Sequence, residues 1–292
     1  MLLANLAQGR PFSLFLEWNI LLYTGILAFI AGLGWTISTW SRQLGDIVAI
    51  AILSALVVAS VRYCFRRAAP WSPEKVLAQS AAVDYVLYAG CLIWLVELAW
   101  IEQRFHLLSG QWDNYLLATA ALFFVFAYRF DNRFVLSLAL SSLAGWFGIA
   151  FWHGPAPLKG SREGAILYSL LIVGVGTILS RRGLKAHFVE TYLNIAANVL
   201  FAAVLSGLFT RGNDFAWLVF LLALCAASLA WGLTRRQFIF VAYAAVYGYI
   251  GVSAPVTRIL DNFILVLGYF VVTGAVMLAV LVQIARHFGR ES

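Results

Sequence analysis

Apolar runs, each about as long as a membrane span, follow one another along this sequence and constrain its fold more than any other feature. A helix needs about 20 consecutive apolar residues to cross the hydrocarbon core of a bilayer. We therefore predict an all-α fold, a polytopic transmembrane helical bundle of about ten helices. The ten predicted spans cover residues 18–38, 46–62, 83–101, 115–128, 134–152, 164–180, 190–209, 215–233, 237–254 and 262–284.

The low charge of the chain identifies lipid as its main solvent. Of its 292 residues 63% are hydrophobic and only 11% are charged, whereas a soluble domain carries roughly 25% charged residues. The longest joints, at 63–82, 102–114 and 153–163, are too short to fold by themselves. We therefore predict that residues 1–292 form a single integral membrane domain. Residues 1–9 contain no basic residue, and no A-x-A site follows the first apolar run. We therefore expect that this run is a retained helix and not a cleaved signal peptide.

The distribution of basic residues predicts the orientation of the spans. Cytoplasmic joints of membrane proteins carry an excess of Lys and Arg, so the net charge of +7 indicates topology and not a nucleic-acid partner. With ten spans, one side of the membrane holds 14 basic residues: Arg10, Arg62, Arg66, Arg67, Lys75, Arg129, Arg133, Arg181, Arg182, Lys185, Arg235, Arg236, Arg286 and Arg290. The other side holds 6: Arg42, Arg104, Lys159, Arg162, Arg211 and Arg258. This alternation predicts that both termini are cytoplasmic.

An internal repeat is one interpretation of the second and third parts of the chain. A shift of 103 residues aligns Arg133 with Arg236, Gly145 with Gly248, and Gly148 with Gly251. A four-helix unit repeats in the same orientation, which predicts parallel pseudo-symmetry. The predicted organisation is a helix pair at 18–62 followed by four-helix units at 83–180 and 190–284. The alternative is a chance alignment of hydrophobic hairpins that share a composition.

Glu97 is an acidic residue inside a predicted span. If that span begins near Val83, Glu97 lies about 20 Å along it at 1.5 Å per residue. A charged carboxylate inside hydrocarbon is expensive and is often functional, so one interpretation is a protonatable or cation-binding site. The other interpretation, which we favour, is a protonated or snorkelling side chain near the outer boundary, with Glu102 marking the end of the span.

A polar stripe opens the seventh predicted span. His187, Thr191, Asn194 and Asn198 are separated by 4, 3 and 4 residues, and this spacing places them on one helical face. Buried asparagines in membrane helices form interhelical hydrogen bonds worth roughly 0.6–2 kcal/mol each. We favour this packing role. The alternative is the lining of a polar cavity that opens to the cytoplasm, with Glu190 and His187 at its mouth.

Four basic residues after the second predicted span form a candidate contact for anionic lipid headgroups: Arg62, Arg66, Arg67 and Lys75. Juxtamembrane basic clusters attract such lipids, although topology alone also accounts for this one. The ninth span is expected to end at Pro255, because proline breaks the hydrogen-bond pattern of a helix.

Catalytic and metal-binding signatures do not occur in the sequence. Its three cysteines, Cys64, Cys91 and Cys225, form no C-x-x-C pair, and its four histidines fall at span ends or joints, unlike the paired ligands of a b-type haem. Walker, H-E-x-x-H and G-x-S-x-G motifs are absent. We therefore expect no cofactor and no metal, and we expect neither an intramembrane protease nor a primary pump.

The first half of the chain resembles a bacterial membrane-protein family. The matching residues are Trp18-Asn19, Gly25, Gly32, Trp40, Leu44-Gly45-Asp46 and the stretch from Arg62 to Pro70. They resemble the predicted membrane proteins catalogued as domain of unknown function 2157, and the hairpin from Tyr115 to Gly148 is similar in style to the middle helices of that family. Those proteins often carry a soluble helical segment ahead of the first span, whereas at most 17 residues precede it here. The resemblance implies a location in the bacterial cytoplasmic membrane and no particular activity.

Three functions are compatible with these observations. The leading hypothesis is a non-enzymatic structural or accessory subunit of a membrane assembly, whose partners are membrane lipids and other membrane subunits. The second is a small secondary transporter or lipid or metabolite carrier, with Glu97 as its coupling site and Asn194 and Asn198 as its substrate site. The third and weakest is a membrane enzyme that acts on lipid.

Overall fold

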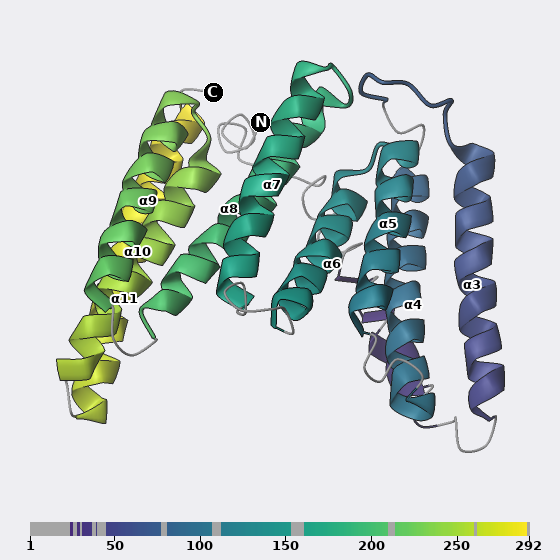
Figure 1. The fold of residues 1–292 in the computed structure, drawn as a ribbon, viewed down its shortest axis with the longest axis horizontal. Coiled ribbons are helices and arrows are strands. Elements are labelled where there is room, and N and C mark those ends of the chain that lie inside the picture. Colours follow the sequence, from purple (N-terminus) through teal and green to yellow (C-terminus); the bar gives the residue numbers. More distant parts are fainter. Residues whose placement is uncertain are drawn as a thin grey trace, which may run out of the picture. The chain divides into compact units, whose positions relative to one another are not determined.

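The structure, a computed structural model, describes residues 24–25, 28–29, 31–36, 39, 45–76, 81–106, 112–152, 161–209, 214–259 and 262–290. All regular elements in these ranges are helical (Figure 1). They are α3 (Asp46–Arg67), α4 (Ala81–Phe105), α5 (Trp112–Phe130), α6 (Arg133–Trp152), α7 (Ser161–Arg181), the 3₁₀ turn η1 (Ala186–Phe188), α8 (Val189–Gly207), α9 (Asp214–Thr234), α10 (Phe238–Ile259) and α11 (Phe263–Arg290). The predicted all-α class is confirmed for the described part of the chain.

Seven of the described helices are long and apolar enough to cross a membrane, and α5 and α6 are apolar but contribute shorter stretches. This finding indicates a membrane protein. Nine of the ten predicted runs coincide with a described helix. The first run, 18–38, lies mostly outside the described residues, although 31–36 is helical. The count of ten and the orientation therefore stay predictions.

The ends of α3 follow from local chemistry. Gly45 precedes the helix with a φ of 81°, a left-handed conformation that glycine adopts without steric cost. Asp46 lies in the first turn, and Arg66 and Arg67 lie in the last. These charges oppose the partial charges of the helix dipole at both ends, which stabilises the helix termini.

The α5–α6 and α9–α10 connections use the same tight turn. Asp131 has a φ of 55° and Arg236 a φ of 53°. In each turn the next residue donates its N–H to a carbonyl five residues back, from Asn132 to Ala127 at 3.0 Å and from Gln237 to Gly232 at 2.9 Å, the pattern of a Schellman motif. The two turns are 105 residues apart and not 103. The predicted register therefore misaligns the turns by two residues, and the repeat stays a prediction.

Pro255 does not end α10, contrary to the expectation from the sequence. The helix continues to Ile259 with the proline inside it. Proline removes one hydrogen bond to the carbonyl four residues earlier, here that of Gly251. A position in the last turn and a half limits the disturbance to that end of the helix, so α10 is longer than the predicted run 237–254.

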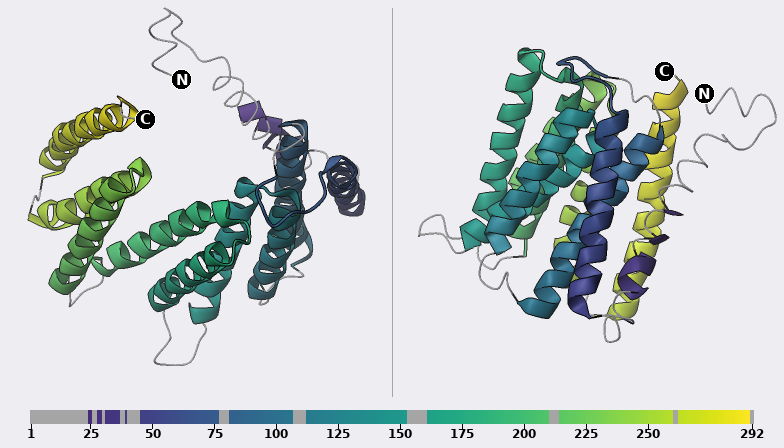
Figure 2. Two further views of the ribbon diagram at one scale, coloured as in Figure 1. Left: turned by 90° about the horizontal axis from the view of Figure 1, so that it is seen from above. Right: turned by 90° about the vertical axis from the view of Figure 1, so that its right-hand side faces the viewer.

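The contacts divide the chain into two compact units. Unit 1 comprises Met1–Ser142 and Gly183–Ala186, and unit 2 comprises Leu143–Arg182 and His187–Ser292. The division falls inside α6, whereas the sequence placed a sub-unit boundary between residues 180 and 190. In unit 1, α3 packs against α4. In unit 2, α7 packs on α8, α8 on α9 and α10, and α10 on α9 and α11, so that α10 contacts both α9 and α11 (Figure 2).

Small residues allow the closest helix contacts. A Cβ added to Gly90 would lie 2.9 Å from the Cβ of Ser60, and one added to Gly176 would lie 2.7 Å from the Cβ of Tyr192. Membrane helices approach closely where glycine offers such space. The core of unit 2 is the cluster of Phe201, Val204, Leu208 and Leu221.

Candidate functional site

Glu97 lies in the α3–α4 interface of unit 1. Its side chain is buried, with 5% of its surface exposed, and Oε1 accepts a hydrogen bond from the hydroxyl of Ser54 on α3. Its second carboxylate oxygen, Oε2, is buried without a hydrogen-bond partner among the described residues. The low exposure does not fit a snorkelling side chain. Glu97 therefore links α4 to α3 through Oε1. Its Oε2 can bind a proton or accept a hydrogen bond from a further donor.

The asparagine stripe holds α8 to α10 in unit 2. Asn198 donates from Nδ2 to the hydroxyl of Tyr243 at 2.7 Å and accepts at Oδ1 from the hydroxyl of Tyr247 at 3.1 Å. The ring of Tyr247 also stacks on Phe201, with the centroids 4.8 Å apart. Asn198 thus has the interhelical role that the sequence favoured.

The other members of the stripe have different surroundings. Asn194 accepts at its backbone carbonyl from Asn198, while its side-chain Oδ1 is buried without a hydrogen-bond partner among the described residues. Thr191 is half-buried. His187 precedes α8 in the 3₁₀ turn, with its ring centroid 4.6 Å from that of Phe188. Glu97 belongs to unit 1 and the stripe to unit 2, so these residues are not members of one compact unit.

The predicted lipid-contacting cluster is exposed. Arg62, Arg66 and Arg67 are exposed in the last turns of α3, and Lys75 is exposed in the segment that follows. The Arg67 guanidinium lies 5.9 Å from the centroid of the Tyr63 ring. The four side chains are therefore accessible to lipid headgroups on the side where α3 ends.

A buried ion pair in unit 1 was not predicted from the sequence. Lys185 and Asp131 meet at 2.9 Å between Nζ and Oδ2, with side-chain exposures of 1% and 4%. Lys185 Nζ also donates to the carbonyl of Glu74 at 2.9 Å, and its backbone N–H donates to the carbonyl of Pro73 at 2.8 Å. Asp131 accepts the backbone N–H of Val76. A buried pair of this kind is stable because further hydrogen bonds satisfy both charges.

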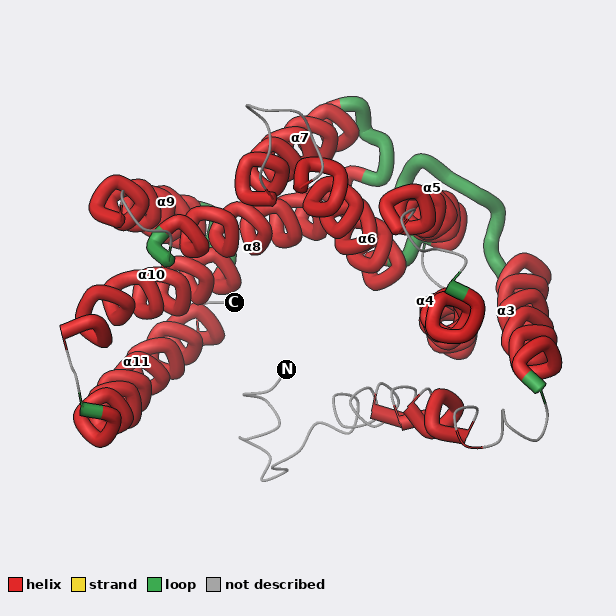
Figure 3. The backbone as a smooth tube through the Cα atoms, turned by 60° about the horizontal axis from the view of Figure 1, so that its bottom comes forward, coloured by secondary structure: helices red, strands yellow, loops and turns green. Residues whose placement is uncertain are grey.

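Neighbouring polar contacts extend this cluster. Asn132 donates from Nδ2 to Asp84 Oδ1 at 2.8 Å and to the Tyr88 hydroxyl at 3.0 Å, and it accepts the N–H of Val135 at 3.0 Å. Arg129 donates to the carbonyl of Ala69 at 3.0 Å. Hydrogen bonds to Arg129 and Asp131 therefore attach the loop that follows α3 to the end of α5 and the α5–α6 turn (Figure 3).

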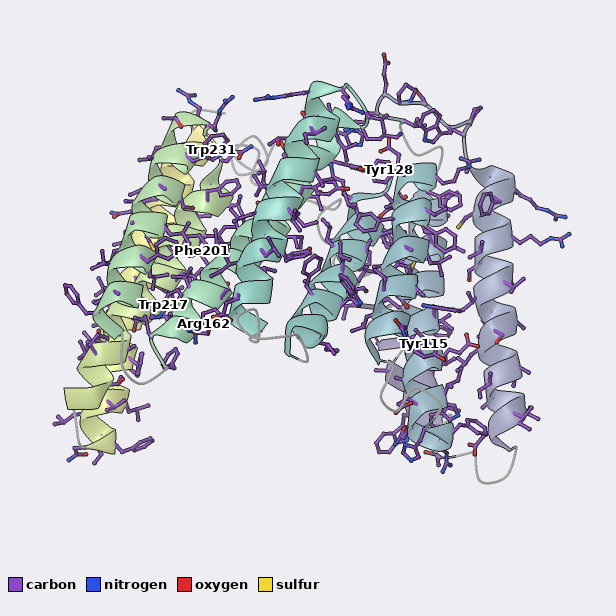
Figure 4. All side chains as sticks on the ribbon, viewed as in Figure 1. Tyr115, Tyr128, Arg162, Phe201, Trp217 and Trp231 are labelled. Carbon is purple, nitrogen blue, oxygen red and sulfur yellow. The ribbon has the colours of Figure 1, made fainter. Side chains whose placement is uncertain are left out.

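Unit 2 contains a cavity of about 590 Å³ between α7, α8, α9 and the start of α10, within the usual size range of small-molecule sites. Ser169, Val173, Leu193, Phe201 and Leu224 are among its lining residues, and Glu190, Trp231, Arg235 and Gln237 line its polar end. Figure 4 shows Trp231 towards one end of the unit, Phe201 at mid-height, and Trp217 and Arg162 towards the opposite end.

At that opposite end, the Arg162 guanidinium lies 4.9 Å from the centroid of the Trp217 ring, and its Nε donates to Ser206 at 3.3 Å. A Cβ on Gly207 would lie 2.3 Å from the same indole. Packing therefore closes this end of the unit, away from the cavity.

Among the described residues, no group of three or more His, Cys, Asp or Glu side chains is placed to hold a metal ion. Comparison with known proteins assigns no relationship: no family model, no curated protein and no solved structure matches the chain.

Proposed function

We propose that this chain is a multi-pass integral membrane protein of ten spans, with both termini cytoplasmic, that serves as a non-enzymatic structural or accessory subunit of a membrane assembly. The seven long apolar helices support the membrane location. The charge alternation supports the orientation, and the resemblance to the family of unknown function supports the bacterial cytoplasmic membrane.

The observation that carries the proposal is the face of α11 opposite its neighbour α10. Tyr269 and Thr273 attach α11 to α10 through hydrogen bonds to Ser253 at 3.1 Å and Tyr249 at 2.8 Å. On the other side of α11, an exposed apolar seam recurs every three or four residues. The seam consists of Leu267, Val271, Ala275, Leu278 and Val282.

The α11 seam has the form of a helix-packing surface. Residues at this spacing share one helical face, and a small residue, Ala275, lies at its centre, where it permits close approach. A second transmembrane helix can reach the seam without meeting α10. We infer that a helix of a partner subunit packs on it.

The polar side chains inside the spans also support a structural role. Asn198 donates a hydrogen bond to Tyr243 of α10 and accepts one from Tyr247 of α10, and Glu97 accepts one from Ser54 of α3. Each bond joins neighbouring helices, which is the use that membrane bundles make of such groups.

The test is purification of the tagged chain in mild detergent from its own membrane. We expect the same partner protein at a fixed ratio to the tagged chain. Val271→Trp should abolish this co-purification because it adds bulk to the seam, whereas Val272→Trp should preserve it. The two valines are adjacent and equally exposed, at 63% and 64%. A monodisperse monomer, or equal recovery of the partner with both variants, would refute the proposal.

A second candidate function is a proton-coupled carrier. The observation that favours it is the buried Glu97 Oε2, which has no hydrogen-bond partner among the described residues. If Glu97 exchanges a proton during transport, Glu97→Gln should abolish a pH-driven flux in vesicles while expression stays intact. If the Glu97→Leu variant is expressed at the wild-type level and shows the same pH-driven flux as the wild type, Glu97 has no carrier role.

A further inference from the structure

The cavity of unit 2 is amphipathic. Its body is lined mainly by apolar side chains such as Val173, Leu193 and Leu224, and its polar end holds Glu190 and Arg235 together with other polar groups. The Arg235 guanidinium lies 5.2 Å from the centroid of the Trp231 ring. A tryptophan beside a basic residue is typical of the interface between lipid headgroups and hydrocarbon. The polar end therefore has the composition of a headgroup region.

The length of the cavity matches one leaflet of a bilayer. Its lining extends over residues 169–180 of α7, 189–201 of α8 and 224–235 at the end of α9. From the first to the last residue of these ranges there are eleven or twelve steps along the chain, a rise of about 16–18 Å in a helix, which is close to half of a hydrocarbon core about 30 Å thick. If the polar end lies at the interface, a cavity of this length extends to about the middle of the bilayer, with Phe201 among its lining residues.

The two charges at the mouth select among amphipathic ligands. Glu190 and Arg235 are both exposed there and are opposite in sign. A water-soluble metabolite does not match the apolar body, and a lipid with a purely anionic headgroup would meet repulsion from Glu190. A headgroup that carries one phosphate and one ammonium complements both residues.

We propose that unit 2 binds one phospholipid with a zwitterionic phosphate–amine headgroup, the chemistry of phosphatidylethanolamine. Arg235 donates to the phosphate, Glu190 accepts from the ammonium, and an acyl chain fills the apolar body. Charge-assisted hydrogen bonds of this kind are among the stronger ones in proteins. This site goes beyond the proposed function, because a bound lipid is required by neither the subunit nor the carrier role.

The test is a titration of the delipidated full-length protein in detergent, followed by native mass spectrometry. Dioleoyl phosphatidylethanolamine should bind with a stoichiometry of one and at least about tenfold more tightly than dioleoyl phosphatidylglycerol. Arg235→Gln should weaken binding of phosphatidylethanolamine by about tenfold. Arg236→Gln, at the next residue and outside the cavity lining, should leave it unchanged.

Two further variants separate headgroup recognition from chain binding. Glu190→Gln should remove the preference for phosphatidylethanolamine over phosphatidylglycerol. Ala197→Trp, which fills the cavity, should abolish binding, whereas Ala202→Trp on the exposed side of the same helix should not. Equal binding of the two lipids to the wild type, or equal effects of Arg235→Gln and Arg236→Gln, would overturn the proposal. Wild-type binding by the folded Ala197→Trp variant would do the same.

Discussion

Replacement of Lys185 by methionine is predicted to remove a large part of the stability of unit 1. The Lys185 and Asp131 side chains are 1% and 4% exposed and meet at 2.9 Å, so solvent screens their interaction little. The removal of one partner from a buried pair leaves an uncompensated charge, at a typical cost of about 3–5 kcal/mol. The variant also loses the hydrogen bond from Nζ to the Glu74 carbonyl. We therefore expect a loss near the upper end of that range.

The assay is equilibrium unfolding in mixed micelles with increasing sodium dodecyl sulfate, followed by far-ultraviolet circular dichroism. Lys75→Met, an exposed lysine in the loop after α3, is the matched control and should change stability by less than about 0.5 kcal/mol. The double variant Lys185→Met, Asp131→Asn should recover most of the loss, because it removes the orphaned charge while the amide still accepts the Val76 N–H. A loss below 1 kcal/mol for Lys185→Met, or no recovery in the double variant, would refute this account of the pair.

Three smaller predictions use the same assay. Gly176→Ala should destabilise by about 1–3 kcal/mol because its Cβ would lie 2.7 Å from the Cβ of Tyr192, whereas Gly174→Ala, with nothing within 4 Å, should be neutral or stabilising; equal effects would contradict the α7–α8 packing. Asn198→Leu should cost about 1–3 kcal/mol through its two lost interhelical bonds, and a neutral result would remove its packing role. His106→Gly should stabilise by about 0.5–1 kcal/mol, because His106 has a φ of 49° after α4; His106→Ala, which keeps the strain, should give no such gain.

The helical class and the approximate positions of the nine long described helices could be predicted from the sequence, because long uninterrupted apolar runs are visible in it. Boundaries were less accessible. Pro255 was expected to end its helix, but one lost hydrogen bond in the last turn and a half did not stop α10. The two tight turns have the same geometry at a separation of 105 residues. The identical residues that suggested a repeat are 103 residues apart and so did not predict the separation of the turns.

The buried ion pair was missed because a basic residue in a joint has an ordinary explanation. Lys185 was counted among the cytoplasmic charges that orient the chain, and the same count would hold if its side chain were exposed. Its partner Asp131 is 54 positions away, and only tertiary structure brings them together. One local signal is present in the sequence: aspartate is a residue type that tolerates the positive φ which Asp131 adopts in this turn.

Part of the candidate site could be predicted from helical spacing, and part depends on tertiary structure. The spacing of Asn194 and Asn198 predicts one shared face, and the interhelical role of Asn198 follows from it. The different surroundings of their side chains depend on which residues of α10 lie opposite, and helical spacing carries no information about that. The cavity of unit 2 depends on four helices together. From the sequence, Glu190 was therefore named only as the mouth of a polar cavity and Arg235 only as a charge that orients the chain.

Photo-crosslinking in intact membranes tests most directly whether a partner helix packs on the α11 seam. A photoreactive phenylalanine analogue would replace Val271 on the seam or, as the control, the equally exposed Val272. We expect a saturable adduct of the 32.3 kDa chain with one polypeptide from position 271 and lipid adducts from position 272. Lipid adducts alone from both positions would contradict it.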